Sequence, residues 1–269
     1  MTARLFMTTD TVGGVWRYST TLAALLARGG TSVRLGIIGN PPSADQCAEA
    51  AAIVGVDWAH LGVPLDWQAG GADALAPGRR AIAKAAAAWR SDVVQLNQPA
   101  YAGGGYAAPT IAVAHSCVET WWRATHGVSA PPTWAWHRDA VRAGLRSAEA
   151  AVAPSAAFAA ALREAYRLET PLDVVHNGSP KRADGEKARF VFAAGRLWDD
   201  GKNFAVLDEA APLIRWPVRL AGAAAAPGVA DPYGIPASNV AGTWTQEEWQ
   251  RCSPRLRSSC RRRSMNRTD

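Results

Sequence analysis

Two basic side chains lie close together in a segment that could bind a diphosphate. Arg196 and Lys202 belong to the sequence GRLWDDGKN (residues 195–203), between a predicted strand at 190–194 and a predicted helix at 204–214. Loops at the carboxyl ends of strands form the usual ligand side of parallel sheets. Arginine offers a planar fork and lysine a point charge, and both can bind the charged oxygens of phosphate groups. Two cations in a loop can also be ordinary surface charge.

A pair of glycines, Gly13 and Gly14, lies between a predicted strand at 4–8 and a predicted helix at 15–28. Glycines at this point let the backbone approach a phosphate or a sugar, and the amino end of a helix favours negative charge. The alternative is a tight turn with no ligand. A dinucleotide site is disfavoured, because the G-x-G-x-x-G pattern and an acid after the second strand are both absent.

His115 is the third candidate, because it follows a predicted strand at 110–114. A neutral imidazole can hydrogen-bond a hydroxyl without fixing a charge, although a single histidine is often structural. Tryptophans 121, 122, 134 and 136 cluster downstream, where they could pack in the core or stack on a sugar.

Strands and helices alternate along the chain in a way that would place these residues at strand ends. Predicted strands at 4–8, 32–38, 56–61, 92–96, 110–114, 150–153 and 173–175 alternate with predicted helices at 15–28, 43–53, 81–89, 118–124, 136–147 and 156–166. The first of these helices has Leu22, Leu25 and Leu26 on one face. This pattern predicts an α/β fold with a doubly wound parallel sheet.

The domain organisation follows from a polar stretch in the middle of the chain. We expect a first Rossmann-like domain at 1–178, a linker at 179–188 (SPKRADGEKA) and a partial second Rossmann-like domain at 189–250. Within the second domain we expect strands at 190–194 and 218–221, a loop at 223–238, a short strand near Val240, and a helix opened by a capping box at Thr245.

The composition gives no sign of a nucleic-acid-binding body. The net charge of +6 comes entirely from residues 251–269, which hold seven arginines and one acid. No run of the sequence has the 18 or more apolar residues of a membrane span, and the start is too short and polar for a secretory signal. The four cysteines show no metal-ligand spacing. We therefore expect a cytoplasmic protein, with at most peripheral contact with a membrane.

The arginine-rich tail at 251–269 has an unusual property at the level of the genetic code. In a shifted frame, Met265 followed by Asn266 must encode Glu, Asp269 followed by a stop codon must encode Leu, and the codons between allow Pro-Tyr-Gly. We expect that this tail is non-native and arises from a frameshift that truncates the second domain, which sequencing of the gene would test. A disordered tail that binds anions is the alternative.

The chain resembles the GT-B glycosyltransferases of family 4, also called group 1. The resemblance covers about residues 3–250, and the shifted-frame Glu-Pro-Tyr-Gly-Leu is similar to the donor-binding motif of that family. Its most specific segments are TDTVGGV (9–15), His115-Ser116, Pro154-Ser155, His176-Asn177-Gly178 and GRLWDDGKN (195–203).

This resemblance implies a GT-B fold and transfer of a sugar with retention of the anomeric configuration. Arg196 and Lys202 would grip the diphosphate of a nucleotide-sugar donor without a metal or other cofactor. Gly13 and Gly14 would face the ligand, and His115 would act at the transferred sugar. The first domain would bind an acceptor that the sequence does not identify.

Two other functions stay open at this stage. A truncated chain is expected to be weak or inactive, so it could be a non-catalytic interaction fragment with an anion-binding tail. The chain could also be another GT-B enzyme, such as a nucleotide-sugar epimerase. Specific binding of nucleic acid is not expected.

Overall fold

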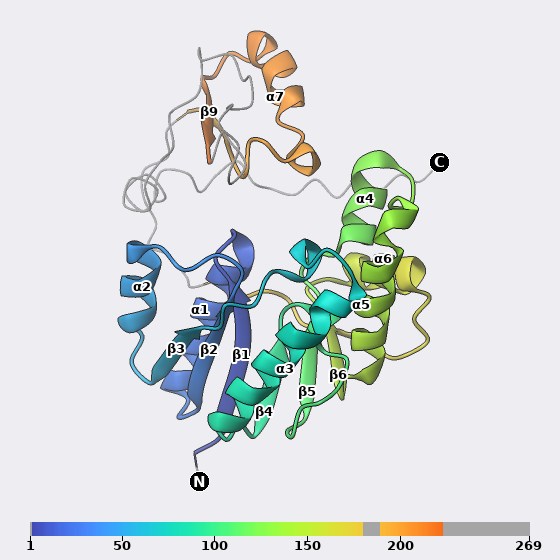
Figure 1. The fold of residues 1–269 in the computed structure, drawn as a ribbon. Helices are drawn as coiled ribbons and strands as arrows, with labels where there is room; N and C mark the ends of the chain where they lie inside the picture. Colours follow the sequence, from blue (N-terminus) through green and yellow to red (C-terminus); the bar gives the residue numbers. More distant parts are fainter. Residues whose placement is uncertain (1, 180–188, 223–269) are drawn as a thin grey trace. The chain divides into compact units, whose positions relative to one another are not determined.

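The computed structural model describes residues 2–179 and 189–222 of the chain. The chain divides into two compact units, Met1–Pro180 and Lys181–Asp269 (Figure 1). Most of the expected linker at 179–188 lies outside the described residues. So do the expected loop at 223–238, the strand near Val240, the helix at Thr245 and the tail on which the frameshift hypothesis depends.

The first unit contains a seven-stranded sheet in which every neighbouring pair of strands is parallel. Its strand order is β3-β2-β1-β4-β5-β6-β7, which confirms the predicted doubly wound sheet. The strands are β1 (Arg4–Asp10), β2 (Ser32–Ile38), β3 (Val56–His60), β4 (Val93–Leu96), β5 (Thr110–Val113), β6 (Ala150–Ala153) and β7 (Asp173–Val174).

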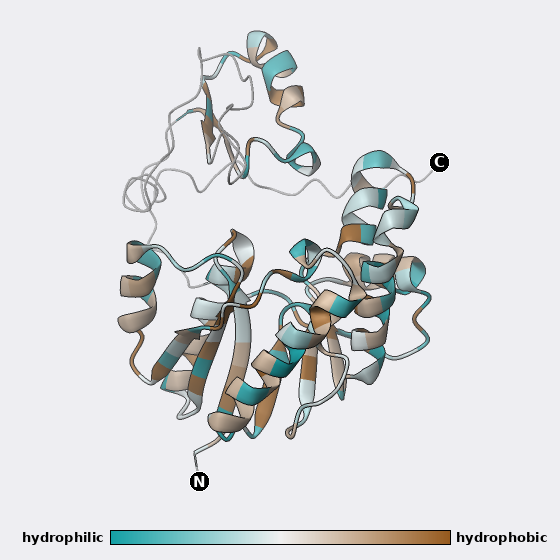
Figure 2. Ribbon diagram, in the orientation of Figure 1, coloured by the Kyte–Doolittle hydropathy of each residue, from teal (hydrophilic) through white to brown (hydrophobic). Residues whose placement is uncertain are grey.

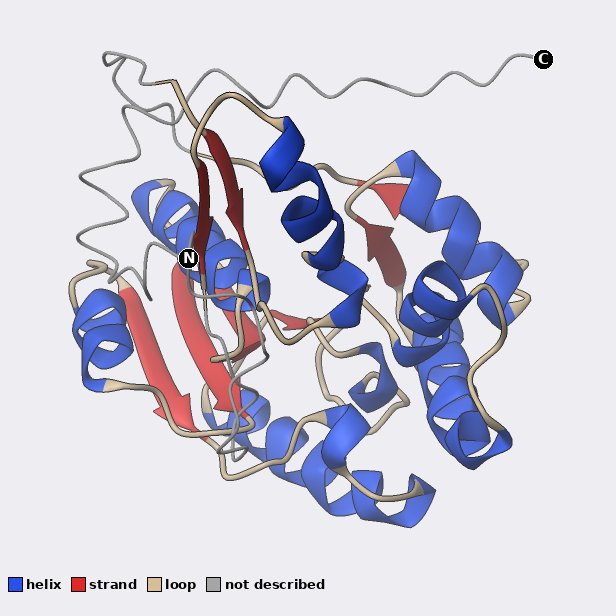
Figure 3. Cartoon of the chain, turned by 90° about the horizontal axis from the view of Figure 1, so that it is seen from above, coloured by secondary structure: helices blue, strands red, loops and turns tan. Residues whose placement is uncertain are grey.

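Helices cover both faces of this sheet, as Figure 3 shows from above. The α-helices are α1 (Gly14–Arg28), α2 (Ala44–Ala51), α3 (Ala72–Ala88), α4 (Val118–His126), α5 (Ala135–Ser147) and α6 (Ala156–Tyr166). Short 3₁₀ turns are η1 (Asp66–Gln68), η2 (Pro99–Tyr101) and η3 (Pro132–Trp134).

The hydrophobic core of the first unit consists of separate clusters on the two faces of the sheet. The larger cluster joins residues of α3, α5 and α6, such as Ile82, Leu145 and Leu162, to Phe6 and Leu96 of the strands. Smaller clusters join α1 and α2 to the other face. In Figure 2 much of β1, β4 and β5 is brown or pale, which is the distribution expected for strands buried between helices.

Helix α3 begins nine residues before the predicted start at residue 81. The prediction was wrong because Pro77 and Gly78 in the sequence indicate a helix break. In the structure both residues lie inside the helix. A Cβ atom on Gly78 would meet Val63 and Tyr101 side-chain atoms at 2.8 and 2.9 Å, so this glycine allows α3 to pack closely against η2. Tertiary packing therefore outweighs the poor local propensity.

Only part of the predicted leucine face of α1 is buried: Leu22 and Leu26 pack against a core cluster. The buried residues of α1 are Trp16, Ser19, Thr20 and Ala23, whereas Leu25 is 55% exposed. Two buried polar residues find hydrogen-bond partners there: the Ser19 hydroxyl oxygen accepts from Nδ2 of Asn97 at 3.1 Å, and the Thr20 hydroxyl donates to the Trp16 carbonyl oxygen at 3.0 Å. Hydrophobic periodicity alone does not reveal this.

The second unit is described by a short βα segment and one further strand. It contains β8 (Val191–Ala194), η4 (Asp200–Lys202), α7 (Ala205–Ala210), η5 (Ala211–Leu213) and β9 (Val218–Ala221). Strands β8 and β9 are parallel, as expected for a second Rossmann-like unit. Its core consists of Leu197, Phe204, Val218 and Leu220.

Candidate functional site

The strand order places the candidate residues of the first unit at a topological switch point. From β1 to β3 the strands follow one another toward one edge of the sheet, and from β4 to β7 toward the other edge. Strands β1 and β4 are therefore parallel neighbours although they are far apart in sequence. Connections on the two sides of such a point diverge, which leaves the carboxyl ends of the two strands accessible to a ligand. Asp10 ends β1, and Asn97 and Gln98 follow β4 directly.

The two glycines form a bare loop at the amino end of α1. Gly13 has φ 87° and ψ −126°, a conformation that other residues rarely adopt, and no side chain caps the helix. Both glycines are exposed, and a Cβ atom on either would have no neighbour within 4 Å. The uncapped N–H groups of α1 therefore border open space, and this is the arrangement that suits an anionic group.

A buried network of hydrogen bonds links this loop to the end of β4. The Val12 N–H donates to Oδ1 of Asp10 at 2.8 Å, and Nε2 of Gln98 donates to Oδ2 of the same carboxylate at 3.2 Å. The Thr8 hydroxyl donates to Oε1 of Gln98 at 2.9 Å and accepts from the Asn97 N–H at 2.9 Å. These side chains are fully or nearly buried. A buried polar network with its members paired fixes one local structure.

His115 joins the same network through its ring. Its Nε2 lies 3.2 Å from Oδ1 of Asn97, and its ring centroid lies 4.4 Å from that of Tyr18 at an interplanar angle of 63°. Burial lowers the pKa of His115 to about 4. Burial also raises the pKa of Tyr18, although a hydrogen bond from Gln95 opposes this. Both rings are therefore neutral near pH 7.

The segment that carries Asn97 and Gln98 is held from behind by two helices. Gly144 of α5 packs so closely on η2 that a Cβ atom there would lie 1.8 Å from the carbonyl oxygen of Pro99. Gly78 of α3 makes the close approach described above. The hydroxyl of Tyr101 in η2 also donates to the carbonyl oxygen of Pro64 at 2.8 Å. The position of Asn97 thus depends on packing between distant segments.

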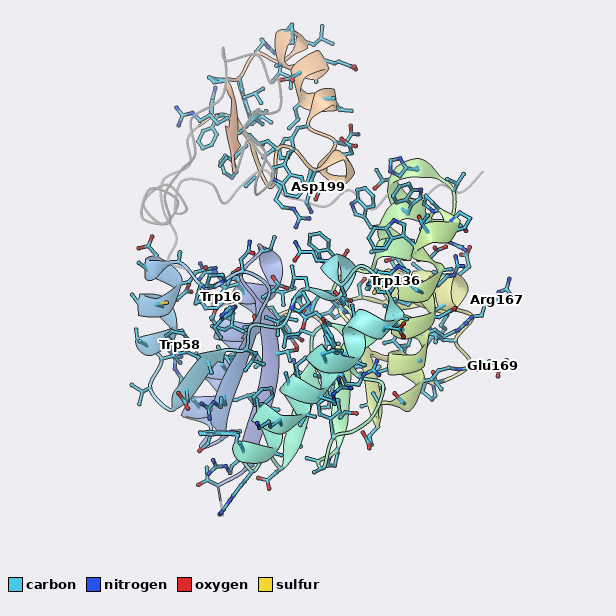
Figure 4. The ribbon with its side chains drawn as sticks, in the orientation of Figure 1. Trp16, Trp58, Trp136, Arg167, Glu169 and Asp199 are labelled. Carbon is cyan, nitrogen blue, oxygen red and sulfur yellow. The ribbon has the colours of Figure 1, made fainter. Side chains whose placement is uncertain are left out.

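The second unit places its two cations at the carboxyl end of β8. Nε and Nη2 of Arg196 both donate to Oδ2 of Asp199, with Nε at 3.1 Å, and Oδ1 of Asp199 accepts from the Gly201 N–H at 3.0 Å. Asp199, labelled in Figure 4, lies on the loop between β8 and α7. Lys202 ends η4, and its side chain is exposed. The guanidinium group is therefore oriented by a buried carboxylate, whereas the ammonium group extends from the loop.

Most of the first unit matches the model of a known protein family. Residues 12–180 match the model described as Glycosyltransferase Family 4. That range covers more than half of the 269-residue chain. The chain belongs to glycosyltransferase family 4. Gly13, Gly14, Asn97 and His115 lie within the matched range.

Solved structures show that this family 4 chain has the GT-B fold. A glycosyltransferase from Rickettsia africae superposes with a TM-score of 0.53 at 12% identity, over 82% of this chain and 60% of that chain. A UDP-glucosyltransferase from Polygonum tinctorium superposes with a TM-score of 0.52 at 11% identity, over 83% and 66%. UGT2 of Phytolacca americana gives 0.51 at 12% identity, over 94% and 71%.

The family 4 chain spans less than two thirds of the length of the first two of these structures, 60% and 66%. No curated protein has a sequence that matches it significantly. Identities near 12% support the common fold and nothing finer.

The sequence named the glycines, His115 and the two cations as candidates, but not the amide side chains of Asn97 and Gln98; the functional role of all of them stays a prediction. The structure brings Gly13, Gly14 and His115 onto one edge of the first unit, joined through Asp10 and Asn97. Arg196 and Lys202 lie together in the second unit. The polar pair Asn97-Gln98 directly after a strand was a signal that could have revealed the network.

The tryptophans occupy an intermediate position between core and surface. Trp134 and Trp136 stack with ring centroids 6.1 Å apart, and Trp121 lies 5.8 Å from Trp122. All four rings are partly buried. Trp136, labelled in Figure 4, packs against the larger core cluster near the start of α5. Trp136 therefore serves core packing, and a sugar-contact role for the four rings stays a prediction.

The two described ranges contain neither a metal-ligand cluster nor a membrane-spanning helix. Residues 2–179 and 189–222 bring no three His, Cys, Asp or Glu side chains together as a set that could hold a metal ion. In the same ranges no helix combines the length and the apolar character needed to cross a bilayer. The expected independence from metals stays a prediction.

Proposed function

We propose that this protein transfers a sugar from a nucleotide-diphosphate donor to an acceptor, with retention of the anomeric configuration, and that the 269-residue chain does so only weakly. One observation carries the proposal: the family 4 match includes the bare glycine loop and His115, which lie on one polar edge at the switch point. Fold similarity alone would not support an activity, because one fold hosts many functions. The residues of this edge and of the β8–α7 loop therefore support the proposal.

In the proposed reaction the bond between the anomeric carbon and the diphosphate oxygen breaks, and the diphosphate keeps the electron pair. An acceptor oxygen forms a bond to the anomeric carbon, and its proton passes to the departing diphosphate oxygen. Arg196 and Lys202 stabilise the charge that appears on the leaving diphosphate, so they act more strongly in the transition state than in the ground state. Asp199 holds the guanidinium of Arg196 in place before the donor binds.

The first unit contributes an uncharged surface for the sugar and an electropositive helix end. The Gly13–Gly14 loop lets a phosphate or sugar approach the N–H groups of α1. With a pKa of about 4, His115 is a poor general base near pH 7. We therefore propose that it makes a hydrogen bond with a sugar hydroxyl and does not remove the acceptor proton.

We also propose the type of donor, the place of the acceptor, the cofactor requirement and the location of the protein. The donor is a nucleotide-diphosphate sugar, the acceptor binds to the first unit, and no metal or cofactor is needed. The protein works in the cytoplasm, with at most peripheral contact with a membrane and without specific nucleic-acid binding.

Product analysis with labelled donors tests the proposed reaction. We would incubate the 269-residue chain with a panel of nucleotide-sugars labelled in the sugar, in EDTA and without an added acceptor, so that water can act as acceptor. Release of labelled free sugar supports glycosyl transfer. A labelled nucleotide-sugar changed only in its sugar stereochemistry indicates an epimerase instead and contradicts the proposal.

Single substitutions test whether donor cleavage depends on Arg196 and Lys202. Arg196→Ala and Lys202→Ala should each lower donor cleavage at least about 10-fold, since a charge-assisted hydrogen bond contributes roughly 1.5–3 kcal/mol. Arg215→Ala, which changes an exposed arginine of the same unit, is the matched control. Equal losses in all three variants would show that the two cations have no special role.

A further inference from the structure

We propose that Asn97 is a positioning residue that fixes the tautomer of His115, so that the ring presents Nδ1 as a hydrogen-bond acceptor for a sugar hydroxyl. The hydroxyl contact rests on the proposed function, whereas the tautomer follows from the buried network itself. Asn97 is 4% exposed and does not need to touch a ligand for this role.

The orientation of the Asn97 amide is determined by its neighbours. One end of the amide lies 2.7 Å from the backbone carbonyl oxygen of Thr8. A carbonyl oxygen only accepts, so the atom that faces it must be the NH₂ group, Nδ2. The same Nδ2 lies 3.1 Å from the hydroxyl of Ser19. The opposite end is therefore the oxygen, Oδ1.

That oxygen in turn determines where the imidazole carries its proton. Oδ1 of Asn97 lies 3.2 Å from Nε2 of His115 and 3.1 Å from Nε2 of Gln95. An amide oxygen only accepts, so Nε2 of the histidine must carry the hydrogen. A neutral ring has one N–H, so Nδ1 keeps its lone pair. Asn97 thus selects one of two tautomers.

Tyr18 and Gln95 restrict the ring and its partner further. The Tyr18 ring meets the imidazole edge to face at 4.4 Å, and Gln95 Nε2 lies 3.2 Å from the Tyr18 hydroxyl oxygen. The amide of Gln95 therefore braces both Tyr18 and Asn97. In the described parts of the chain, no hydrogen bond uses Nδ1 of His115, so this nitrogen remains for a ligand.

The consequence for recognition is chemical selectivity. A fixed acceptor at Nδ1 binds a hydroxyl, which can donate, and does not bind a carbonyl or ether oxygen, which cannot. Sites built to hydrogen-bond a hydroxyl discriminate strongly against analogues that lack it. The Asn97–His115 pair would therefore favour binding of sugars that carry a hydroxyl at one position over analogues that lack it.

Nitrogen NMR of the His115 ring in the full-length chain tests the tautomer without any ligand. Near pH 7 we expect a hydrogen on Nε2 and an unprotonated Nδ1. In folded Asn97→Ala the Nδ1–H tautomer should become populated, whereas the control Asn177→Ala, at an exposed position, should leave the ring unchanged. A wild-type ring protonated on Nδ1 would overturn the proposal even if the Asn97→Ala variant does not fold. An unchanged ring in folded Asn97→Ala would overturn the role of Asn97.

The hydroxyl contact is tested in the same sample by adding UDP-glucose and then the other donors that the cleavage screen uses. A donor that binds should shift the Nδ1 resonance in the direction of a hydrogen-bonded acceptor. Binding that leaves this resonance unchanged would overturn the hydroxyl contact. If no donor binds, the proposed function and the hydroxyl contact both fail, while the tautomer result stands on its own.

Discussion

At the scale of single residues, His115 shows how the surroundings of a side chain change its pKa. Its ring lies between Tyr18 and Asn97, and burial lowers its pKa to about 4 from an ordinary value of 6.5. The unfolded chain therefore binds a proton at His115 between these two values, whereas the folded chain does not.

This difference predicts how stability depends on pH. A group whose folded pKa is lower than its unfolded pKa binds the proton first in the unfolded state, so the free energy of unfolding should fall as pH decreases from about 6.5 to 4. The loss attributable to His115 should be about 3 kcal/mol. Urea unfolding of wild type and His115→Gln at several pH values measures it. His126→Gln, at an exposed position, is the control.

A slope that is the same in wild type, His115→Gln and His126→Gln across this window would contradict the burial of a neutral His115. A slope that disappears only in His115→Gln would support it.

The sequence predicted some residues of the site and could not predict others. Arg196 and Lys202 were predictable because glycine, arginine and lysine occur together in one short loop. Asn97 was not, because its role depends on β1 lying beside β4, which brings Thr8 within 2.7 Å of an amide 89 positions away. Asp199 was also missed, since an acid near an arginine in sequence does not reveal that it orients the guanidinium.

At the scale of elements, the site depends on how closely helices approach η2. Gly144 lies in α5, where a glycine costs helix stability, yet no larger residue fits against the carbonyl of Pro99. The predicted helix at 136–147 was confirmed almost to the residue, but this contact was not foreseeable from periodicity. The same reasoning explains why α3 was predicted too short.

We predict that Gly144→Ala lowers the free energy of unfolding by at least about 3 kcal/mol, because α5 and η2 must separate to admit a methyl group. Chemical denaturation measures the change. Gly14→Ala is the control, because a Cβ atom there has no neighbour within 4 Å. A loss below about 1 kcal/mol in Gly144→Ala would show that the contact between α5 and η2 yields easily.

The glycine loop before α1 gives a second prediction at this scale. Gly13→Ala should destabilise the fold by about 1–3 kcal/mol, because its φ of 87° strains any other residue. Gly14→Ala should change stability little yet weaken donor binding, since its methyl group would extend into the open space before α1. Denaturation and donor titration of both variants measure the two effects. If Gly14→Ala binds the donor as tightly as wild type, the loop does not contact the ligand.

At the scale of the whole molecule, the two units differ in the size of the hydrophobic core that the structure describes in each. The first unit has a seven-stranded sheet with core on both faces, whereas the described core of the second unit has four buried residues around two strands. Leu213 is 86% exposed and Trp216 is 48% exposed in the second unit. Resistance to local opening follows buried apolar contacts.

Hydrogen exchange should therefore separate the two units. We expect the amides of β1, β2 and β4 to exchange at least about 100-fold more slowly than those of β8 and β9. Mass spectrometry of peptides from the full-length chain measures this difference. Equal protection of β8 and β1 would show that the second unit is as stable as the first.

The fold of the first unit could be predicted from its alternating pattern because each strand is a short apolar run followed by a turn or a helix. The described part of the second unit agrees with the predicted strands at 190–194 and 218–221. The domain boundaries and the frameshift hypothesis stay predictions, because they depend on residues 180–188 and 223–269, outside the described ranges.

The central claim is that Arg196 and Lys202 bind the diphosphate of the donor, and calorimetric titration tests it most directly. The full-length chain would be titrated in EDTA with UDP, GDP and ADP, alongside Arg196→Ala/Lys202→Ala and the control Arg215→Ala. We predict that at least one nucleotide binds wild type and Arg215→Ala equally and binds the double variant at least about 100-fold more weakly. Equal affinity in the double variant and wild type, or no binding by any of the three nucleotides, would contradict the account.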